Sequence, residues 1–161
     1  MKKITALVLS LITVFTLVAC GNSGSGSSGK TLDLKKVQEN LGTLEYFPSS
    51  MELDDATLKS AYGLDASLLK EKLIGVPMMN VHASMYWVLL PQDGKTDDVK
   101  SAMSKYFESY QASWDSYLPD QAELVRNRME TEIETKDGTW LVYIISEDNN
   151  KTLEQIQGGL S

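Results

Sequence analysis

A row of three glutamates in the second half of the chain is the first place where residue types suggest chemistry. Glu130, Glu132 and Glu134 alternate with Thr131 and Ile133, a period of two that is typical of a strand with one face in water. Carboxylates in such a row have the ligand type for a cation, and acids such as Glu130, Glu132 or Asp148 have the groups for a hydrolase. Like charges on an edge strand also prevent edge-to-edge aggregation, and we favour this simpler explanation.

Other catalytic and metal-binding arrangements lack the residues that they need. His82 is the single histidine and Cys20 the single cysteine among the 161 residues, so a structural zinc site cannot gather four ligands. No G-x-S-x-G stretch is present for a serine nucleophile, and residues 146–150 lack the spacing and the glycine of a calcium-binding EF-hand. We therefore predict no catalytic residue, no metal site and no cofactor.

A stripe of aromatic residues is the one candidate binding surface. The helical spacing is that of a helix face, which predicts mainly core packing for Tyr106, Phe107, Tyr110, Trp114 and Tyr117. Since Tyr106 stands beside Phe107, the aromatic face is wider than one seam, and some of it can line a groove for a peptide, glycan or lipid. The candidate residues for this surface are Tyr86, Trp87, Tyr106, Tyr110 and Trp114.

The first thirty residues predict that the protein is exported from the cytoplasm. A basic start and an apolar run describe a signal peptide over residues 1–19, and the run is shorter than a membrane span. Leu17-Val18-Ala19-Cys20 resembles the lipobox of bacterial lipoproteins, in which Cys20 carries acyl chains such as palmitate after cleavage. Residues 20–30 then predict a lipidated cysteine with a Gly/Ser tether, ahead of one globular domain over residues 31–161. An uncleaved signal-anchor helix is the alternative.

The net charge of the chain bears on which kinds of molecule it can bind. Residues 1–19 hold two of the 15 Lys and Arg residues and none of the 22 Asp and Glu residues, which leaves 13 basic against 22 acidic residues and a net charge of −9. Such a surface is repelled by phosphate backbones, so we predict no nucleic-acid partner. A lipidated Cys20 leaves no thiol for a disulfide, and the domain must depend on its hydrophobic core.

The apolar patterns predict an α+β fold. We expect strands over about 81–90, 130–136 and 139–146 in a small antiparallel sheet, with a hairpin turn at Asp137-Gly138. Helices are expected around residues 32–41, 54–62 and 65–73, over a long stretch from Thr96 or Asp97 to Pro119, and near the C-terminus. We expect the helices to pack on one face of the sheet.

Three stretches resemble a known family. They are Tyr-Gly-Leu-Asp at 62–65, "MYWVLL" at 85–90, and the segment after the long predicted helix, with Tyr117, Pro119 and Gly138. In their order and spacing these stretches resemble a family of small lipoproteins of Gram-positive bacteria that share an uncharacterised domain. The resemblance implies an extracytoplasmic lipoprotein of one domain, and it brings no catalytic residues.

The sequence thus predicts a membrane-anchored, extracytoplasmic lipoprotein on the outer face of the bacterial cytoplasmic membrane. A non-enzymatic binding or accessory domain is the leading interpretation, with an envelope protein, a peptide or a glycan as its ligand. A cell-envelope hydrolase that uses carboxylates is the alternative. A solute-capturing lipoprotein for a transporter is a third class, although such proteins usually need two lobes.

Overall fold

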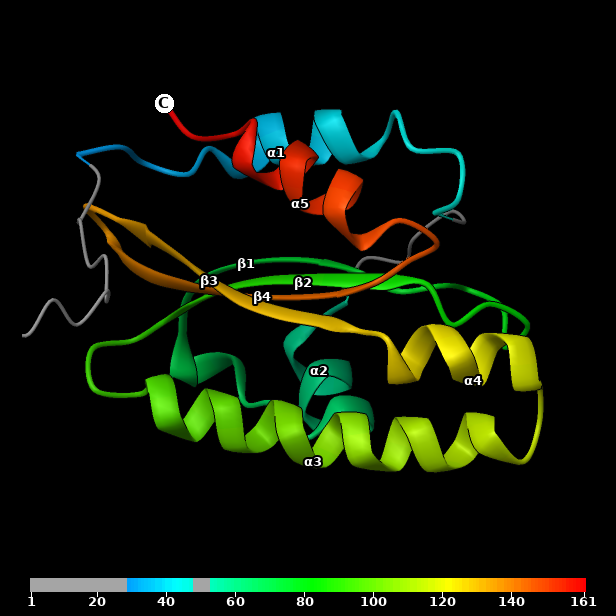
Figure 1. Ribbon diagram of the computed structural model, residues 1–161. Helices are drawn as coiled ribbons and strands as arrows, with labels where there is room; N and C mark the ends of the chain where they lie inside the picture. Colours follow the sequence, from blue (N-terminus) through cyan, green and yellow to red (C-terminus); the bar gives the residue numbers. More distant parts are fainter. Residues whose placement is uncertain (1–28, 48–52) are drawn as a thin grey trace, which may run out of the picture.

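The computed structural model describes residues 29–47 and 53–161, which form an antiparallel sheet between two layers of helices (Figure 1). The strands lie in the order β1-β2-β4-β3, and they are β1 (Leu69–Gly75), β2 (Met85–Pro91), β3 (Met129–Thr135) and β4 (Gly138–Ile145). One face carries α1 (Leu34–Leu41) and α5 (Asn149–Gln157). The other face carries α2 (Asp55–Tyr62), a 3₁₀ turn (Ala66–Leu68), α3 (Thr96–Asp115) and α4 (Pro119–Arg126).

The two central strands explain the two helical layers. Every residue of β2 is buried, and successive side chains of a strand point to opposite faces. Val88 therefore packs with the apolar residues under α1 and α5, whereas Trp87 and Leu89 pack with those of α2 and α3. The α+β class and the small antiparallel sheet are confirmed. The expectation that the helices pack on one face of the sheet is wrong. Because the central strands are apolar on both faces, both faces must be covered by helices.

The strand prediction holds for three of the four strands. The predicted segments 130–136 and 139–146 differ from β3 and β4 by one residue at each end, and the segment predicted from 81 begins at Met85. The helix predicted over residues 65–73 is wrong. That stretch is the 3₁₀ turn followed by β1, which forms the edge of the sheet beside β2.

The two ends of the described chain meet at one end of the sheet. Thr31 and Ser161 exchange two backbone hydrogen bonds of 3.0 Å, and the Lys136 N–H donates to the carbonyl of Lys30 at 3.0 Å. These bonds hold the start of the fold against the β3–β4 turn (Figure 1). The predicted signal peptide and Cys20 lie outside the described residues.

None of the helices in the described ranges has the length and apolar character needed to cross a membrane.

Candidate functional site

The five aromatic candidates do not share one surface. Tyr86 belongs to the core under α1 and α5, where its ring meets the edge of Phe47 at a centroid distance of 5.2 Å. Trp87, Tyr106, Tyr110 and Trp114 lie on the opposite face of the sheet, in the core with α2 and α3. Trp87 is fully buried and Trp114 is 5 % exposed, so within this group Tyr106 and Tyr110 are the residues that reach the surface.

The position of Tyr86 is set by a glycine on the neighbouring strand. Gly75 pairs with Tyr86 across β1 and β2, and a Cβ atom at Gly75 would meet the Tyr86 ring. The tyrosine ring therefore covers the space that the glycine leaves open. This contact is a packing role, and it accounts for Tyr86 without a ligand.

A pocket between α2 and α3 is lined by two members of the aromatic cluster, Tyr62 and Tyr106. We call this cavity of about 420 Å³ the α2–α3 pocket. Tyr62 at the end of α2 and Tyr106 on α3 contribute aromatic rings whose centroids are 5.2 Å apart, and Trp87 packs behind both. The polar side chains that line it are Asp98, Ser101, Lys105 and Ser109. Sequence reasoning missed Tyr62, because it stands outside the aromatic stripe and only the fold brings α2 against α3.

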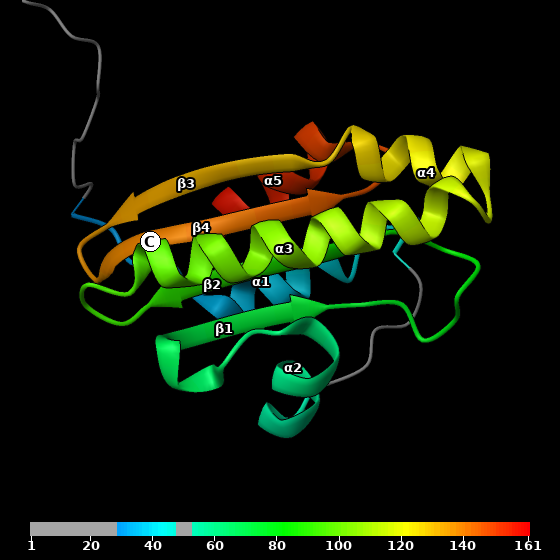
Figure 2. The ribbon, with the colours of Figure 1, turned by 90° about the horizontal axis from the view of Figure 1, so that it is seen from below.

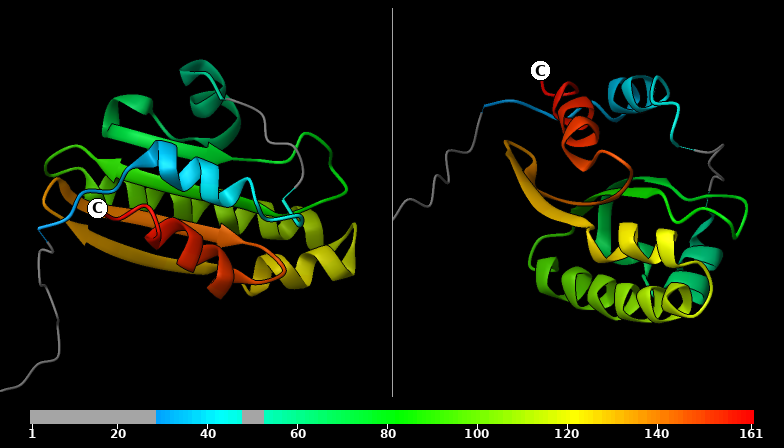
Figure 3. Two further views of the ribbon diagram at one scale, coloured as in Figure 1. Left: turned by 90° about the horizontal axis from the view of Figure 1, so that it is seen from above. Right: turned by 45° about the vertical axis from the view of Figure 1, so that its right-hand side comes forward.

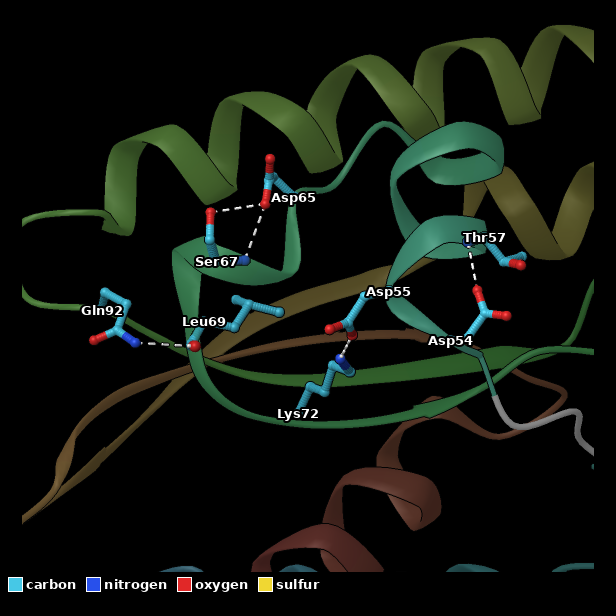
Figure 4. Close-up of polar contacts among 8 residues, drawn as sticks. All are labelled: Asp54, Asp55, Thr57, Asp65, Ser67, Leu69, Lys72 and Gln92. Atoms are coloured by element: carbon cyan, nitrogen blue, oxygen red, sulfur yellow. Dashed lines mark hydrogen bonds and ion pairs between the residues drawn. The ribbon is translucent and has the colours of Figure 1, made fainter.

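The ends of α2 fix where Tyr62 lies, and Figure 4 shows the capping contacts of Asp54 and Asp65 on either side of this helix. The Asp54 carboxylate accepts a hydrogen bond from the Thr57 N–H at 2.7 Å and so caps the start of the helix. Gly63 ends it with a φ of 68°, a left-handed conformation that glycine adopts without strain. Asp65 then accepts from the N–H and the hydroxyl of Ser67, which starts the 3₁₀ turn. Leu64, between Gly63 and Asp65, is fully buried. In the stretch 62–65, Gly63, Leu64 and Asp65 thus each have a structural role.

On α3, helical spacing separates the residues that pack in the core from those that lie at its edge. Met103 and Phe107 are fully buried against the sheet, whereas Tyr106 and Tyr110 lie along the edge of that stripe and stack at a centroid distance of 5.4 Å. The Tyr110 hydroxyl donates to the carbonyl of Ala83 at 3.3 Å, and the Tyr106 hydroxyl contacts the sulfur of Met85 at 3.8 Å.

Burial keeps the phenols of this cluster neutral. Burial raises the pKa of Tyr62, raises the pKa of Tyr110 to about 12, and holds the pKa of Tyr106 still further above its ordinary value. Neutral phenols donate and accept hydrogen bonds but do not act as bases near neutral pH. The pocket therefore offers hydroxyl groups, aromatic surface and one charge of each sign, a set that suits the binding of a small polar ligand.

The predicted acidic row lies beside a second groove. Glu130 and Glu132 line a cavity of about 360 Å³ between β3 and α3, together with Lys100, Ser104 and Tyr143. Each glutamate has its own cation, since Glu130 pairs with Arg128 and Glu132 with Lys100, both at 2.6 Å. Both side chains are about half exposed. A glycosidase pair needs one carboxyl group in an environment that keeps it protonated, and the similar surroundings of these two glutamates do not provide that difference.

The remaining carboxylate candidates have structural partners. Glu134 accepts hydrogen bonds from the hydroxyl of Thr139 at 3.0 and 3.1 Å. Asp148 caps α5 by accepting from the Lys151 N–H at 2.9 Å. His82 is exposed in the loop before β2. Across residues 29–47 and 53–161 no three His, Cys, Asp or Glu residues gather in a way that would hold a metal ion.

A comparison with protein families gives one match. A family model described as a domain of unknown function, DUF4358, matches residues 44–152. The match runs from the end of the α1 region to α5, so it includes the whole sheet, the α2–α3 pocket and the acidic groove. No curated protein and no solved structure matches the chain.

Proposed function

The chain belongs to the family of the DUF4358 domain of unknown function, and we propose that it is a lipid-anchored binding domain outside the cytoplasmic membrane. The observation that carries the binding function is the α2–α3 pocket. Its aromatic rings and hydroxyl groups can hold a small ligand, and its two tyrosines, Tyr62 and Tyr106, are neutral and provide no base. The proposal therefore assigns recognition to this pocket, and no reaction.

The anchor rests on Cys20 and on the short distance along the chain from Cys20 to the fold. Hydrogen bonds hold the chain from Lys30 onward, and we take the Gly/Ser-rich residues 21–29 as the tether in this proposal. Nine residues of this Gly/Ser composition have a root-mean-square reach of roughly 17 Å as a coil. Acyl chains on Cys20 provide stable anchoring without a membrane-spanning helix, since more than one chain is attached.

The ligand class that fits the pocket best is a saccharide unit. A sugar ring has an apolar face that packs on a tyrosine ring and a rim of hydroxyl groups that hydrogen-bond to serine, carboxylate and amine groups. The pocket volume of about 420 Å³ lies in the range for small-molecule sites. A carboxylate-based hydrolase at Glu130 and Glu132 remains the weaker alternative, because both glutamates have partners in similar surroundings.

Replacing the cysteine tests the anchor. We expect Cys20→Ala to abolish incorporation of labelled palmitate and to shift the protein from the membrane fraction to the medium or to an uncleaved precursor. The measurement is metabolic labelling with cell fractionation, and the matched control is Ser23→Ala in the same tether. A Cys20→Ala protein of mature mass that still sediments with membranes would contradict the lipid anchor.

Replacing Tyr62 tests the pocket. We expect N-acetylglucosamine oligomers to give saturation-transfer NMR signals with the intact protein, and Tyr62→Ala to weaken their binding by about tenfold or more, as for other aromatic anchors. Ser113→Ala, on an exposed turn of α3 outside the pocket, is the control. Equal binding by the Tyr62→Ala and Ser113→Ala proteins would remove the pocket from the proposal.

A further inference from the structure

Four large apolar side chains of the described chain are well exposed, and they gather at one end of the molecule. They are Met78, Met79, Val81 and Tyr117, with 64, 59, 46 and 58 % of their surface exposed. The first three belong to the loop between β1 and β2, and Tyr117 belongs to the turn between α3 and α4. We call these four residues the apolar tip.

Hydrogen bonds hold the two segments of the tip together. The Ala83 N–H donates to the side-chain carbonyl of Gln121 on α4 at 2.8 Å, and the Ala83 carbonyl accepts from Tyr110 on α3. Tyr117 packs on Trp114 at a centroid distance of 5.9 Å. The β1–β2 loop and the α3–α4 turn lie at the same end in every view (Figures 2 and 3). The fold therefore holds the end of the β1–β2 loop and the α3–α4 turn at the same end of the molecule.

The tip lies at the far end of the molecule from the tether. The chain enters at Lys30, beside the β3–β4 turn, and α3 begins at that same end of the sheet (Figure 1). From there α3 runs for 20 residues toward the tip, which is a length of about 30 Å.

We propose that the apolar tip docks a basic, amphipathic segment of another envelope protein, on the side of the domain that faces away from the membrane. Methionines suit such docking because their side chains adapt to irregular apolar surfaces. Residues 76–84 and 116–121 contain no Lys or Arg and one acid, Asp120, on a chain whose net charge is negative. A partner with aliphatic side chains and a rim of Lys or Arg therefore complements both the apolar surface and the charge.

The same observations disfavour two other occupants. Insertion into the anchoring membrane would need an almost fully extended tether, because its coil reaches roughly 17 Å and α3 alone spans about 30 Å. The tip also lacks the Lys or Arg residues that attract a loop to anionic lipids. A second copy of the chain would bring its own Asp120 and no Lys or Arg to the contact. The orientation in this inference rests on the proposed lipid anchor, whereas the docking surface itself does not.

Crosslinking from the tip in living cells tests the proposal. A photo-crosslinking amino acid is placed at Met79 in the full-length protein, and at the exposed residue Glu39 on α1 as a control. We expect one protein adduct of reproducible mass from Met79, crosslinked through a partner peptide with Lys or Arg beside aliphatic residues, and none from Glu39. Met78→Ser with Val81→Ser, both in the exposed loop, should lower the adduct yield about tenfold or more.

Four results would overturn the proposal. They are an adduct with phospholipid, an adduct with a second copy of this chain, equal adducts from Met79 and Glu39, and no adduct from Met79. Fractionation of the same cells reports the anchor separately. A protein that gives the Met79 adduct but does not sediment with membranes contradicts the lipid anchor and still supports docking at the tip.

Discussion

Three tyrosines on the α3 side of the sheet are largely buried, and this determines how the protein responds to alkali. Burial raises the pKa values of Tyr106, Tyr110 and Tyr143, and for Tyr143 the nearby Glu130 and Glu132 add to the effect. Below pH 10 both the folded and the unfolded chain keep these phenols protonated. Above pH 10 the unfolded chain loses protons that the folded chain retains, so stability falls as pH rises.

Tyr110→Phe tests this linkage. For each such tyrosine the free energy of unfolding should fall by up to about 1.4 kcal/mol per pH unit between the ordinary pKa near 10 and the folded pKa, which is about 12 for Tyr110. The variant should lose about 1 kcal/mol at pH 8 with its hydrogen bond to Ala83, and should regain part of that deficit at pH 11. Urea unfolding followed by circular dichroism at both pH values measures the difference. A deficit that is the same at pH 8 and pH 11 would contradict the pKa assignment.

At the residue scale the sequence predicted an aromatic face on one helix but not which aromatic residues of other elements join it. Helical spacing grouped Tyr106 and Tyr110 with Phe107, and in the structure both tyrosines pack against the core that contains Phe107. It could not place Tyr62, because the contact between α2 and α3 joins residues far apart in the chain. It also grouped Tyr86 with Trp87, although adjacent strand residues point to opposite faces, and the opposite face became an interior only because α1 and α5 cover it.

At the scale of elements, aspartates explain several helix starts. Asp33 caps α1, Asp54 caps α2, Asp65 caps the 3₁₀ turn and Asp148 caps α5. Each accepts hydrogen bonds from backbone N–H groups that have no partner inside the helix. Some of the excess of acidic over basic residues is therefore explained by helix capping. Capping also explains why an aspartate stands at position 148, without a catalytic role.

Asp148 distinguishes a cap from a catalytic acid. We expect Asp148→Ala to destabilise the protein by about 1 kcal/mol, whereas Asp148→Asn, which keeps an accepting oxygen, should stay close to the original stability. Thermal or urea unfolding of both variants measures this, with Glu147→Ala, at the exposed neighbouring position, as the control. If Asp148→Ala unfolds at the same denaturant concentration as the original protein, the capping bond contributes nothing.

Sequence reasoning missed strand β1, because pairing with the neighbouring strand, and not its own sequence, makes this segment a strand. Residues 68–74 read LLKEKLI, a pattern in which Leu69 and Leu73 fit a helix period as well as the edge of a sheet. Pairing with β2 along most of β1 selects the strand. The central strands were easier to predict, since runs of β-branched and aromatic residues such as those of β4 favour a strand by themselves.

At the scale of the whole molecule, the fold has two ends with different roles in our proposals. One end holds Lys30, Ser161 and the β3–β4 turn, and the proposed tether would join the domain there. The other end presents the apolar tip, and α2 and α3, whose residues line the α2–α3 pocket, lie between the two ends on one face of the sheet (Figure 2). The sequence did not show which features lie at which end of the molecule, because this depends on the direction of each strand and helix.

Fluorescent labels at the two ends would measure this arrangement on membranes. With Cys20 lipidated, a cysteine introduced at Met79 or at Lys136 is the only free thiol, since the chain has one cysteine. Nitroxide-bearing lipids should quench a label at Lys136→Cys, which lies in the turn beside Lys30, much more than a label at Met79→Cys at the tip. The physical reason is that about 30 Å of α3 separates the two ends while the tether coil reaches roughly 17 Å. Stronger quenching at Met79 would mean that the domain lies with its tip on the bilayer, and the tip would then be a membrane contact.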